Sequence, residues 1–495
     1  MEDWARAQRA LARYQHMPSF AGIQEDCQAI MSELRERLEQ QLADPSCEGE
    51  QLGEAVDLLR QLGLPAEQLA QRYLAHCAAS LEPHLAALEV QAELAAGDTS
   101  HHTTTALLDP LQFVDEGCNK FLVELGLAAT GYTATFPGEG EAERLVSWLV
   151  ELLERYMATT RARLGREGGA GETELLVRAL DRFYRRLCAA SKLLPGQDLP
   201  RAGLNLVLGV AGEVCQAAAQ QLDIALQSSI TDARQALAQP RRAAETRLNL
   251  QEVNTSLLAA IQHQLRDTLA RLRVFLDTDT FSGKTHFRSS FCVTMVQQGV
   301  LIRHFDQIVA ACSKFCTGRP VSPGLLLLLS RTCLDLQSST TASLAAHQAE
   351  QFQLDRPTDI TQVNTALAVQ AQALLTAYVQ AQAADLSLMI RKSVEARDWL
   401  SAVEPRSVRA VMKRVVEDVT GIDEQVGQLY EEGPKKVRSS DSSRTLGHRS
   451  KSVFSSYANS SNLDSSLASN IQKLFSEKID YFTPVTASKV CFNQH

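Results

Sequence analysis

The chain has 495 residues, of which 45% are hydrophobic and 22% are charged, and its formal net charge at pH 7 is -9. Mild acidity argues against a general nucleic-acid-binding protein, which needs a basic face to neutralise phosphates. Aromatic residues make up only 6% of the chain, and strong helix formers such as Ala, Leu, Gln, Glu and Arg dominate it. We therefore predict an all-α fold, built as several domains or as one elongated array of packed units.

Short amphipathic helices are predicted in the first part of the chain. Runs of helix-forming residues at 23–42, 51–62, 65–94 and 113–127 are separated by polar or glycine-containing segments. Short connections of this kind are typical of helices that lie antiparallel to their neighbours in a bundle. We predict an N-terminal helical bundle region over residues 1–164.

The clearest amphipathic stripes follow, on a helix beginning near residue 145 and on another beginning near residue 176. Their large apolar residues recur at steps of three and four, so they fall on one helix face. The residues that we predict for the core are Trp148, Leu149, Leu152, Phe183 and Leu187.

Long helices are predicted in a central helical bundle region over residues 172–432. Their expected ranges are 204–237, 248–276, 287–315, 325–353 and 363–400. No apolar run approaches the roughly 20 residues that a membrane span needs. The most apolar runs, at 203–212 and 325–329, are predicted to be buried helix segments, so membrane association would be peripheral and go through partners or surface charge.

Residues 391–433 contain the most regular pattern. Apolar residues alternate steps of four and three, the 3.5-residue period of a helix that buries one seam against another helix. The predicted packing seam consists of Val408, Met412, Val415, Val419, Ile422, Val426 and Leu429. About three heptads is close to the minimum for an inter-chain coiled coil, and Gly421 and Gly427 weaken a free-standing helix. Packing within a bundle is favoured, and an inter-chain coiled coil is the alternative.

Composition changes after Gly433. Residues 433–469 are rich in serine, carry more basic than acidic side chains, and lack periodic apolar positions. Such a segment cannot bury enough surface to offset its ordering entropy, so we predict a Ser-rich basic disordered linker. A helical pattern resumes at 470–482, and residues 470–495 are predicted to be the start of a truncated C-terminal helical domain.

The sequence offers little for chemistry, and we predict no catalytic, cofactor-binding or metal-binding residue. The motifs of nucleophilic and metal-dependent hydrolases and of phosphate-binding loops do not occur. Cys312 and Cys316 share a helix face, with His304 as the nearest further metal ligand. Two reduced core cysteines are the favoured interpretation. The eleven cysteines form no disulfide framework, which is typical of a cytosolic chain.

Three arginines near the second stripe, Arg182, Arg185 and Arg186, could meet anionic lipid or an acidic partner, although a solvated helix face is favoured. One of them, Arg186, would be the candidate if the chain were a helical GTPase-activating protein. A helical adaptor with no role in vesicle traffic is the other alternative.

Six stretches of the chain carry a resemblance to a known family. They are ARYQHMPSFAGIQEDCQAI, LLVRALDRFYRRL, PGLLLLLSRTCLDL, RKSVEARDWLSAVEPRSVRAVMKRVVEDV, GQLYEEGPKKVRSSDSS and SNIQKLFSEKIDYFTPV. In this order they resemble the vacuolar protein sorting fifty-one family, also called the fat-free homologues. The fourth stretch and SNIQKLFSEKID are the most specific.

The resemblance implies a non-catalytic subunit shared by two vesicle-tethering complexes. These are the Golgi-associated retrograde protein complex (GARP), at the trans-Golgi network, and the endosome-associated recycling protein complex (EARP), at recycling endosomes. The implied fold is a rod of stacked helical bundles, without cofactors. The implied partners are the other subunits of these complexes and, for the family, a syntaxin SNARE.

The same resemblance implies that this chain corresponds to a fragment of the family's full length. It would lack the N-terminal coiled coil, through which the family assembles and contacts a syntaxin, and most of the C-terminal domain. No residue of this chain is therefore assigned to SNARE contact.

Overall fold

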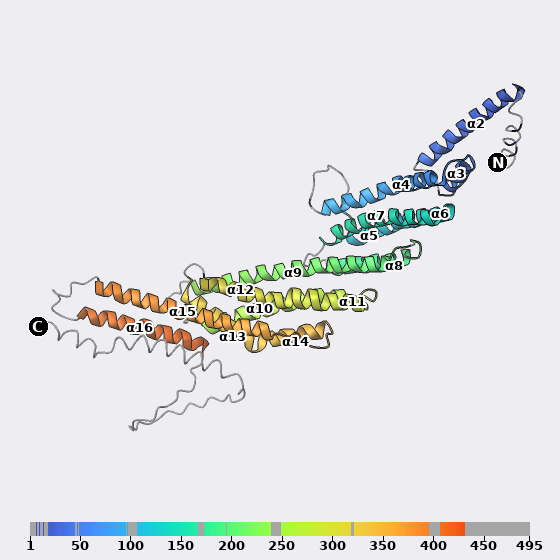
Figure 1. Cartoon of the computed structure of the whole chain (residues 1–495). Coiled ribbons are helices and arrows are strands. Elements are labelled where there is room, and N and C mark those ends of the chain that lie inside the picture. Colours follow the sequence, from blue (N-terminus) through green and yellow to red (C-terminus); the bar gives the residue numbers. More distant parts are fainter. Residues whose placement is uncertain are drawn as a thin grey trace. The chain divides into compact units, whose positions relative to one another are not determined.

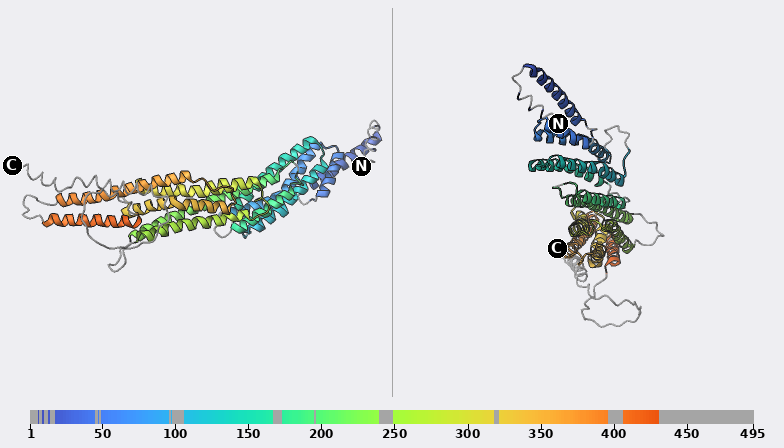
Figure 2. Two further views of the ribbon diagram at one scale, coloured as in Figure 1. Left: turned by 90° about the horizontal axis from the view of Figure 1, so that it is seen from below. Right: turned by 90° about the vertical axis from the view of Figure 1, so that its right-hand side faces the viewer.

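The computed structural model describes residues 6, 9, 13, 18–44, 47, 49–95, 97, 106–166, 173–194, 196–238, 249–317, 321–395 and 406–430 (Figures 1 and 2). Within these ranges every regular element is a helix, which confirms the all-α prediction. The predicted linker over 433–469 and the predicted domain start over 470–495 lie outside the described residues.

The chain divides into two units, each assembled from segments that are distant in sequence. Unit 1 consists of residues 1–217 and 271–295, and unit 2 consists of residues 218–270 and 296–495. The break that we predict from the sequence between residues 164 and 172 falls inside unit 1.

Unit 1 begins with helices that pack against both adjacent and more distant helices of the same unit. They are α2 (Pro18–Ala43), α3 (Gly49–Gln61), α4 (Ala66–Ala95), α5 (Pro110–Glu116), the π-helical η1 (Gly117–Leu122), α6 (Val123–Thr135), α7 (Glu139–Leu164) and α8 (Thr173–Ala190). α4 packs against α7, α5 against α8, and α3 against both α2 and α6. The unit also contains the first part of α9 (Leu199–Ala238), the 3-10 turn η2 (Val274–Leu276), α11 (Thr285–Arg288) and the start of the π-helical η3 (Ser289–Ile302).

Local sequence explains where several of these helices begin and end. Gly63, with φ of +86°, makes the turn between α3 and α4, a conformation that strains any residue with a side chain. Asp109 caps α5, because its carboxylate accepts a hydrogen bond from the backbone N of Gln112 at 2.8 Å. Pro110 follows at the first helical position, where its missing N–H leaves no bond unmade.

The core of unit 1 contains groups of packed aromatic side chains among its leucines. Tyr73 and Tyr132 lie edge to face with ring centroids 5.7 Å apart, and Tyr132 lies 4.9 Å from Phe136. A second group stacks Phe121 on Tyr156 at 4.9 Å. Each such pair buries a large apolar area and adds a geometric preference, which favours one packing of the surrounding helices.

The structure shows where the predicted core residues of unit 1 lie. Leu149, Phe183 and Leu187 are fully buried, whereas Trp148 and Leu152 are half-buried. The buried apolar residues of α7 are Leu145, Leu149, Leu153, Tyr156 and Leu164. The apolar arc of α7 is wide, and its contacts with α4, α5 and α6 decide which part of the arc lies innermost.

Unit 2 contains the rest of α9 and η3, together with most of α10 and the later helices. They are α10 (Leu250–Arg273), α12 (Arg303–Thr317), α13 (Pro323–Asp335), the π-helical η4 (Leu336–Thr340), α14 (Thr341–Gln351), α15 (Thr361–Glu395) and α16 (Arg406–Leu429). α13, η4 and α14 follow one another without interruption, as the predicted helix at 325–353 requires. α15 packs against α12 and α13, and α16 contacts α13 and α15.

The core of unit 2 is aliphatic. The five consecutive leucines of α13, Leu325–Leu329, are all at most 4% exposed, because neighbouring elements surround that helix. Facing positions of α15 complete this core with Val363, Leu367, Ala371, Leu374 and Leu375. The predicted buried segment at 325–329 is thus a core helix of unit 2.

α9 is the one described helix that is long and apolar enough to cross a membrane by length and composition alone. The predicted run at 203–212 is part of this helix, which continues for 40 residues. Half of its most apolar stretch is buried inside the protein, and a core helix has the same composition. The hydropathy of α9 is therefore only weak evidence for a membrane span.

Candidate interaction surface

The last two described helices, α15 and α16, lie side by side in unit 2 (Figures 1 and 2). The part of α15 up to Tyr378 contributes to the core, but none of its residues from 379 to 395 is buried. On α16, none of residues 412–428 is buried, whereas Leu429 is 4% exposed. We call residues 379–395 and 412–428 the outer helix pair.

A polar anchor fixes the C-terminal end of α16 to the core of unit 2. The Tyr430 hydroxyl donates a hydrogen bond to Ser330 Oγ at 2.9 Å, and Ser330 Oγ donates to the backbone oxygen of Ala371 at 2.8 Å. Gln428 Oε1 accepts from the backbone N of Leu250 at 2.9 Å. Burial raises the pKa of Tyr430, so its hydroxyl keeps its proton and acts as a donor.

Charged groups reinforce the same anchor. The guanidinium of Arg331 lies 5.7 Å from the centre of the Tyr430 ring and pairs with Asp335 at 2.7 Å. Asn254 Nδ2 donates to the other carboxylate oxygen of Asp335 at 2.6 Å, which ties α10 to the same site.

Our sequence prediction missed Tyr430. Its signal is its position directly after the last seam residue, where a side chain with an apolar ring and a polar tip can reach the core.

The predicted packing seam runs from this anchor into the outer helix pair. The side chain of Val408 lies outside the described part of the chain, and Met412 is 52% exposed. Four further seam residues, Val415, Val419, Ile422 and Val426, are half-exposed, and Leu429 is buried. Burial along the seam therefore decreases with distance from the anchor.

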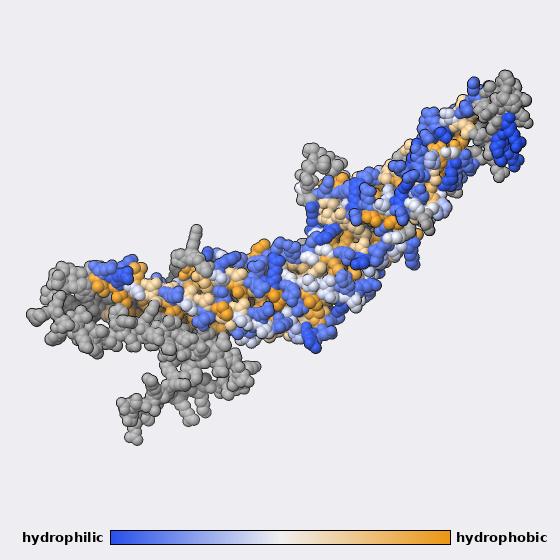
Figure 3. All heavy atoms as spheres, in the orientation of Figure 1, coloured by the Kyte–Doolittle hydropathy of each residue, from blue (hydrophilic) through white to orange (hydrophobic). Residues whose placement is uncertain are grey.

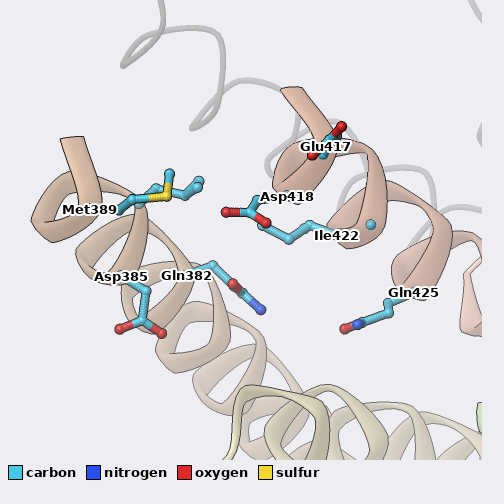
Figure 4. Close-up of a pocket in the computed structure, with 9 residues that line it drawn as sticks. Gln382, Asp385, Met389, Glu417, Asp418, Ile422 and Gln425 are labelled. Atoms are coloured by element: carbon cyan, nitrogen blue, oxygen red, sulfur yellow. The ribbon is translucent and has the colours of Figure 1, made fainter. Parts of the chain in front are cut away.

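A hollow of about 320 Å³ lies between the two helices of the outer pair (Figure 4). α15 lines it with Gln382, Asp385, Leu386 and Met389, and α16 with Glu417, Asp418, Gly421, Ile422 and Gln425. Met389 and Gln382 point from α15 towards α16, while Asp418, Ile422 and Gln425 point the opposite way. The hollow thus combines apolar side chains with three carboxylates.

Two of these carboxylates already have partners on their own helix. Glu417 pairs with Lys413 at 3.7 Å, and Asp418 lies 4.0 Å from Arg414. In the described part of the chain, no ion pair involves Asp385. The hollow is therefore weakly acidic, and Asp385 provides an unpaired charge at its edge.

Apolar side chains outside the hollow are also exposed on the outer helix pair. Leu388 and Val394 on α15 are 50% and 49% exposed, and Val416 on α16 is 61% exposed. Figure 3 shows apolar surface over the last turns of α15. Contiguous apolar surface on a folded protein is typical of a site that another element covers.

A second hollow, of about 350 Å³, lies between α9 and α10 within unit 2. Small residues such as Ala233, Ala236 and Ala260 line it, and Asp232 and Glu252 lie at its edge. It lacks the exposed large apolar residues of the outer helix pair.

Of the two cysteines that we considered as metal ligands, Cys312 lies in the core of unit 2 and Cys316 is half-buried. Cys312 Sγ is 3.8 Å from the Sγ of Cys333, and Cys316 Sγ accepts a hydrogen bond from Gln370 Nε2 at 3.4 Å. Burial lowers the pKa of His304 to about 4, and neither of its ring nitrogens has a hydrogen-bond partner among the described residues. No group of three or more His, Cys, Asp or Glu residues in the described ranges could hold a metal ion.

The three arginines of α8 bind acidic or polar side chains of unit 1. Arg182 pairs with Asp115 at 2.6 Å, and Arg185 pairs with Asp181 at 2.8 Å. Arg186 donates to Asn119 Oδ1 at 2.9 Å. These contacts favour a structural role over the binding of lipid or of a nucleotide phosphate.

The comparisons with known proteins agree along nearly the whole chain. The chain is similar to proteins named "Vacuolar protein sorting-associated protein 51 homolog". The relative from Xenopus tropicalis is 40% identical over 98% of this chain and 65% of its own length, and the relative from Homo sapiens is 41% identical over 98% of this chain and 63% of its own length. The relative from Drosophila melanogaster is 32% identical over 99% of this chain and 68% of its own length. The chain therefore spans about two thirds of the length of these curated relatives.

Two other comparisons add little. No protein-family model matches the chain. A solved "Circular tandem repeat protein with novel repeat topology and enhanced subunit contact surfaces" is 14% identical, covers 83% of this chain and 93% of its own, and has a TM-score of 0.21, too low to support any argument. On the strength of the sequence relatives, the chain belongs to the family of vacuolar protein sorting-associated protein 51 homologs.

Proposed function

We propose that this chain is a non-catalytic subunit of a multisubunit vesicle-tethering complex. The observation that supports this most strongly is the identity of about 40% with proteins named for vacuolar protein sorting, which extends over 98% of the chain. The helical architecture and the exposed apolar outer helix pair fit a protein whose work is to pack against other proteins.

In finer detail, we propose that the complexes are GARP and EARP. The chain would act at the cytosolic face of the trans-Golgi network and of recycling endosomes, in retrograde capture of endosome-derived carriers and in endocytic recycling. Its partners would be the other subunits of these complexes, and fusion would be promoted through SNAREs. Membrane association would go through those partners.

The proposed mechanism is geometric. Each subunit of a tether holds its partners at a fixed separation, and several weak contacts act together once the first has formed. Linking them raises the effective concentration of the later contacts, which strengthens the bridge between two membranes without any single tight contact.

Affinity purification of the tagged 495-residue chain from animal cells tests the proposal. We expect the other GARP and EARP subunits to co-purify. Leu327→Asp places a charge at a fully buried position and should abolish capture by unfolding unit 2. Val369→Asp, at a 65% exposed position of α15 outside the outer helix pair, is the matched control, and it should leave the fold and capture intact.

Two results would count against the proposal. One is recovery of the wild-type chain without any tethering subunit. The other is equal recovery of those subunits with Leu327→Asp, since capture by an unfolded chain would be nonspecific.

A further inference from the structure

Among the described residues, no third element covers the outer helix pair as α12 and α13 cover the inner part of α15. The inner part of α15 is covered by α12 and α13, whereas residues 379–395 of α15 contribute no buried residue. Between the outer parts lies the hollow that Leu386, Met389 and Ile422 line. Two helices alone bury little of each other's apolar surface, so a groove of this kind can accept an amphipathic helix.

Glycine leaves space on the α16 side of this groove. A Cβ added at Gly421, which lines the hollow, would meet no atom within 4 Å. The same holds for Gly427, which does not line the hollow. Gly421 therefore offers a way to fill the groove without disturbing the helices, and Gly427 offers a matched control.

The chain carries a fitting segment after α16. At residues 470–482, Ile471, Leu474, Phe475, Ile479 and Phe482 recur at helical spacing on one face. Asn470 is a favourable N-cap, and Pro484 follows closely after the last apolar residue. The sequence thus predicts a short amphipathic helix with defined ends.

One charge interrupts the apolar face of that segment. At 100° per residue, Lys478 lies between Leu474 and Ile471 on the helical wheel, so a helix docked by this face brings an ammonium group into the groove. The carboxylates of Asp385 on α15 and of Asp418 on α16 both line the groove, and Asp385 has no ion pair among the described residues. The charge on the segment and the charge in the groove are therefore complementary.

The connection is long enough for the segment to reach the groove. α16 has 24 residues and is about 36 Å long. The about 40 residues between α16 and Asn470 would, as a flexible chain, span about 35 Å on average. A tether of this length gives the segment an effective concentration near the millimolar range, which favours it over a free partner with the same contacts.

We propose that residues 470–482 of this chain dock as an amphipathic helix in the groove between the outer parts of α15 and α16, with Lys478 beside Asp385. The docked helix covers Leu386, Met389 and Ile422. It converts the outer helix pair into a three-helix layer that continues the packing around the inner part of α15.

Hydrogen exchange of the full chain, followed by mass spectrometry at two protein concentrations, tests this proposal. Amides of residues 471–482 should exchange at least about tenfold more slowly than in an unstructured peptide, at both concentrations. Gly421→Leu fills the groove and should remove this protection, whereas Gly427→Leu should preserve it. Exchange in α13 should be the same in every variant, which verifies that unit 2 remains folded.

Charge reversal gives an independent test that does not depend on the size of residue 421. Lys478→Glu should remove the protection, and the double variant with Asp385→Lys and Lys478→Glu should restore it. Three results would overturn the proposal: unprotected amides at 471–482 in the wild type, unchanged protection in Gly421→Leu, or protection that grows with protein concentration. The last would assign the groove to a second copy of the chain.

Discussion

α13 and α16 both pack against α15, but their apolar residues have different surroundings. The five leucines of α13 are at most 4% exposed, whereas four of the seven seam residues of α16 are half-exposed and Met412 is 52% exposed. α13 faces the inner part of α15 and also contacts η4 and α16. Apolar side chains are buried only as far as neighbours are available to cover them, so similar hydrophobicity produces a core helix in one place and an interaction surface in the other.

The first prediction compares the two helices by deleting methyl groups. Leu327→Ala, at a fully buried position of α13, should destabilise unit 2 by about 3 kcal/mol, because it leaves a cavity in a packed core. Val415→Ala, on the half-exposed seam, should cost less than about 1 kcal/mol. Urea unfolding with hydrogen exchange of α13 amides measures both, and equal losses would remove the distinction between the two helices.

The second prediction concerns the pH dependence of stability. Its source is His304 on α12, the helix that packs against the inner part of α15. Because burial holds the pKa of His304 at about 4, below its ordinary value of 6.5, the folded state binds fewer protons than the unfolded state between these values. Protonation of His304 therefore does not reduce the free energy of unfolding above about pH 6.5. This free energy should decrease by up to about 3 kcal/mol as the pH falls to about 4.

Thermal unfolding between pH 7.5 and pH 4 measures this effect. His304→Leu should flatten the dependence, since the variant no longer has an imidazole to protonate. An equally steep loss of stability in the variant would assign the pH dependence to other groups.

The third prediction tests the anchor that joins the two regions. Tyr430→Phe removes the hydrogen bond to Ser330 and should cost about 1 kcal/mol, measured as faster exchange of α16 amides. Ser330→Ala should release α16 similarly, and the double variant should cost less than the sum because the two residues share one bond. Additive losses would show that the bond does not hold the helix.

The fourth prediction has the smallest effect and lies in the outer helix pair. Gly427→Ala should stabilise α16 by about 0.5 kcal/mol, because alanine loses less backbone entropy in a helix and the added Cβ meets no atom within 4 Å. The measure is slower exchange in α16 without change in α13. A loss of stability would mean that an element outside the described residues packs on this glycine.

Much of the fold follows from sequence patterns alone. Alternation at steps of three and four predicted the helices that became α7, α8 and α16, and the leucines of α13 predicted a buried segment. Periodicity located Leu149, Phe183 and Leu187, which are buried, but also Trp148 and Leu152, which are half-buried. A wide apolar arc does not specify which of its positions will face the nearest helices.

The candidate surface depended on information that a periodic pattern does not contain. The seam pattern gives a helix and the face by which it packs, but not how far along that face a neighbour extends. The anchor of Tyr430, Ser330 and Ala371 joins residues up to 100 positions apart, and no local rule predicts such a contact. Its partners become visible only when α13, α15 and α16 are placed together.

The sequence by itself therefore determined the all-α class, the approximate course of the long helices and, through its relatives, the family. Helix propensity and apolar spacing act over a few residues, so they can be recognised in one chain without its fold. Tertiary structure alone decided which apolar faces are covered, where Arg182 and Arg186 find partners, and where the outer helix pair remains open. Those outcomes depend on contacts between distant segments, which fix how much surface each side chain removes from water.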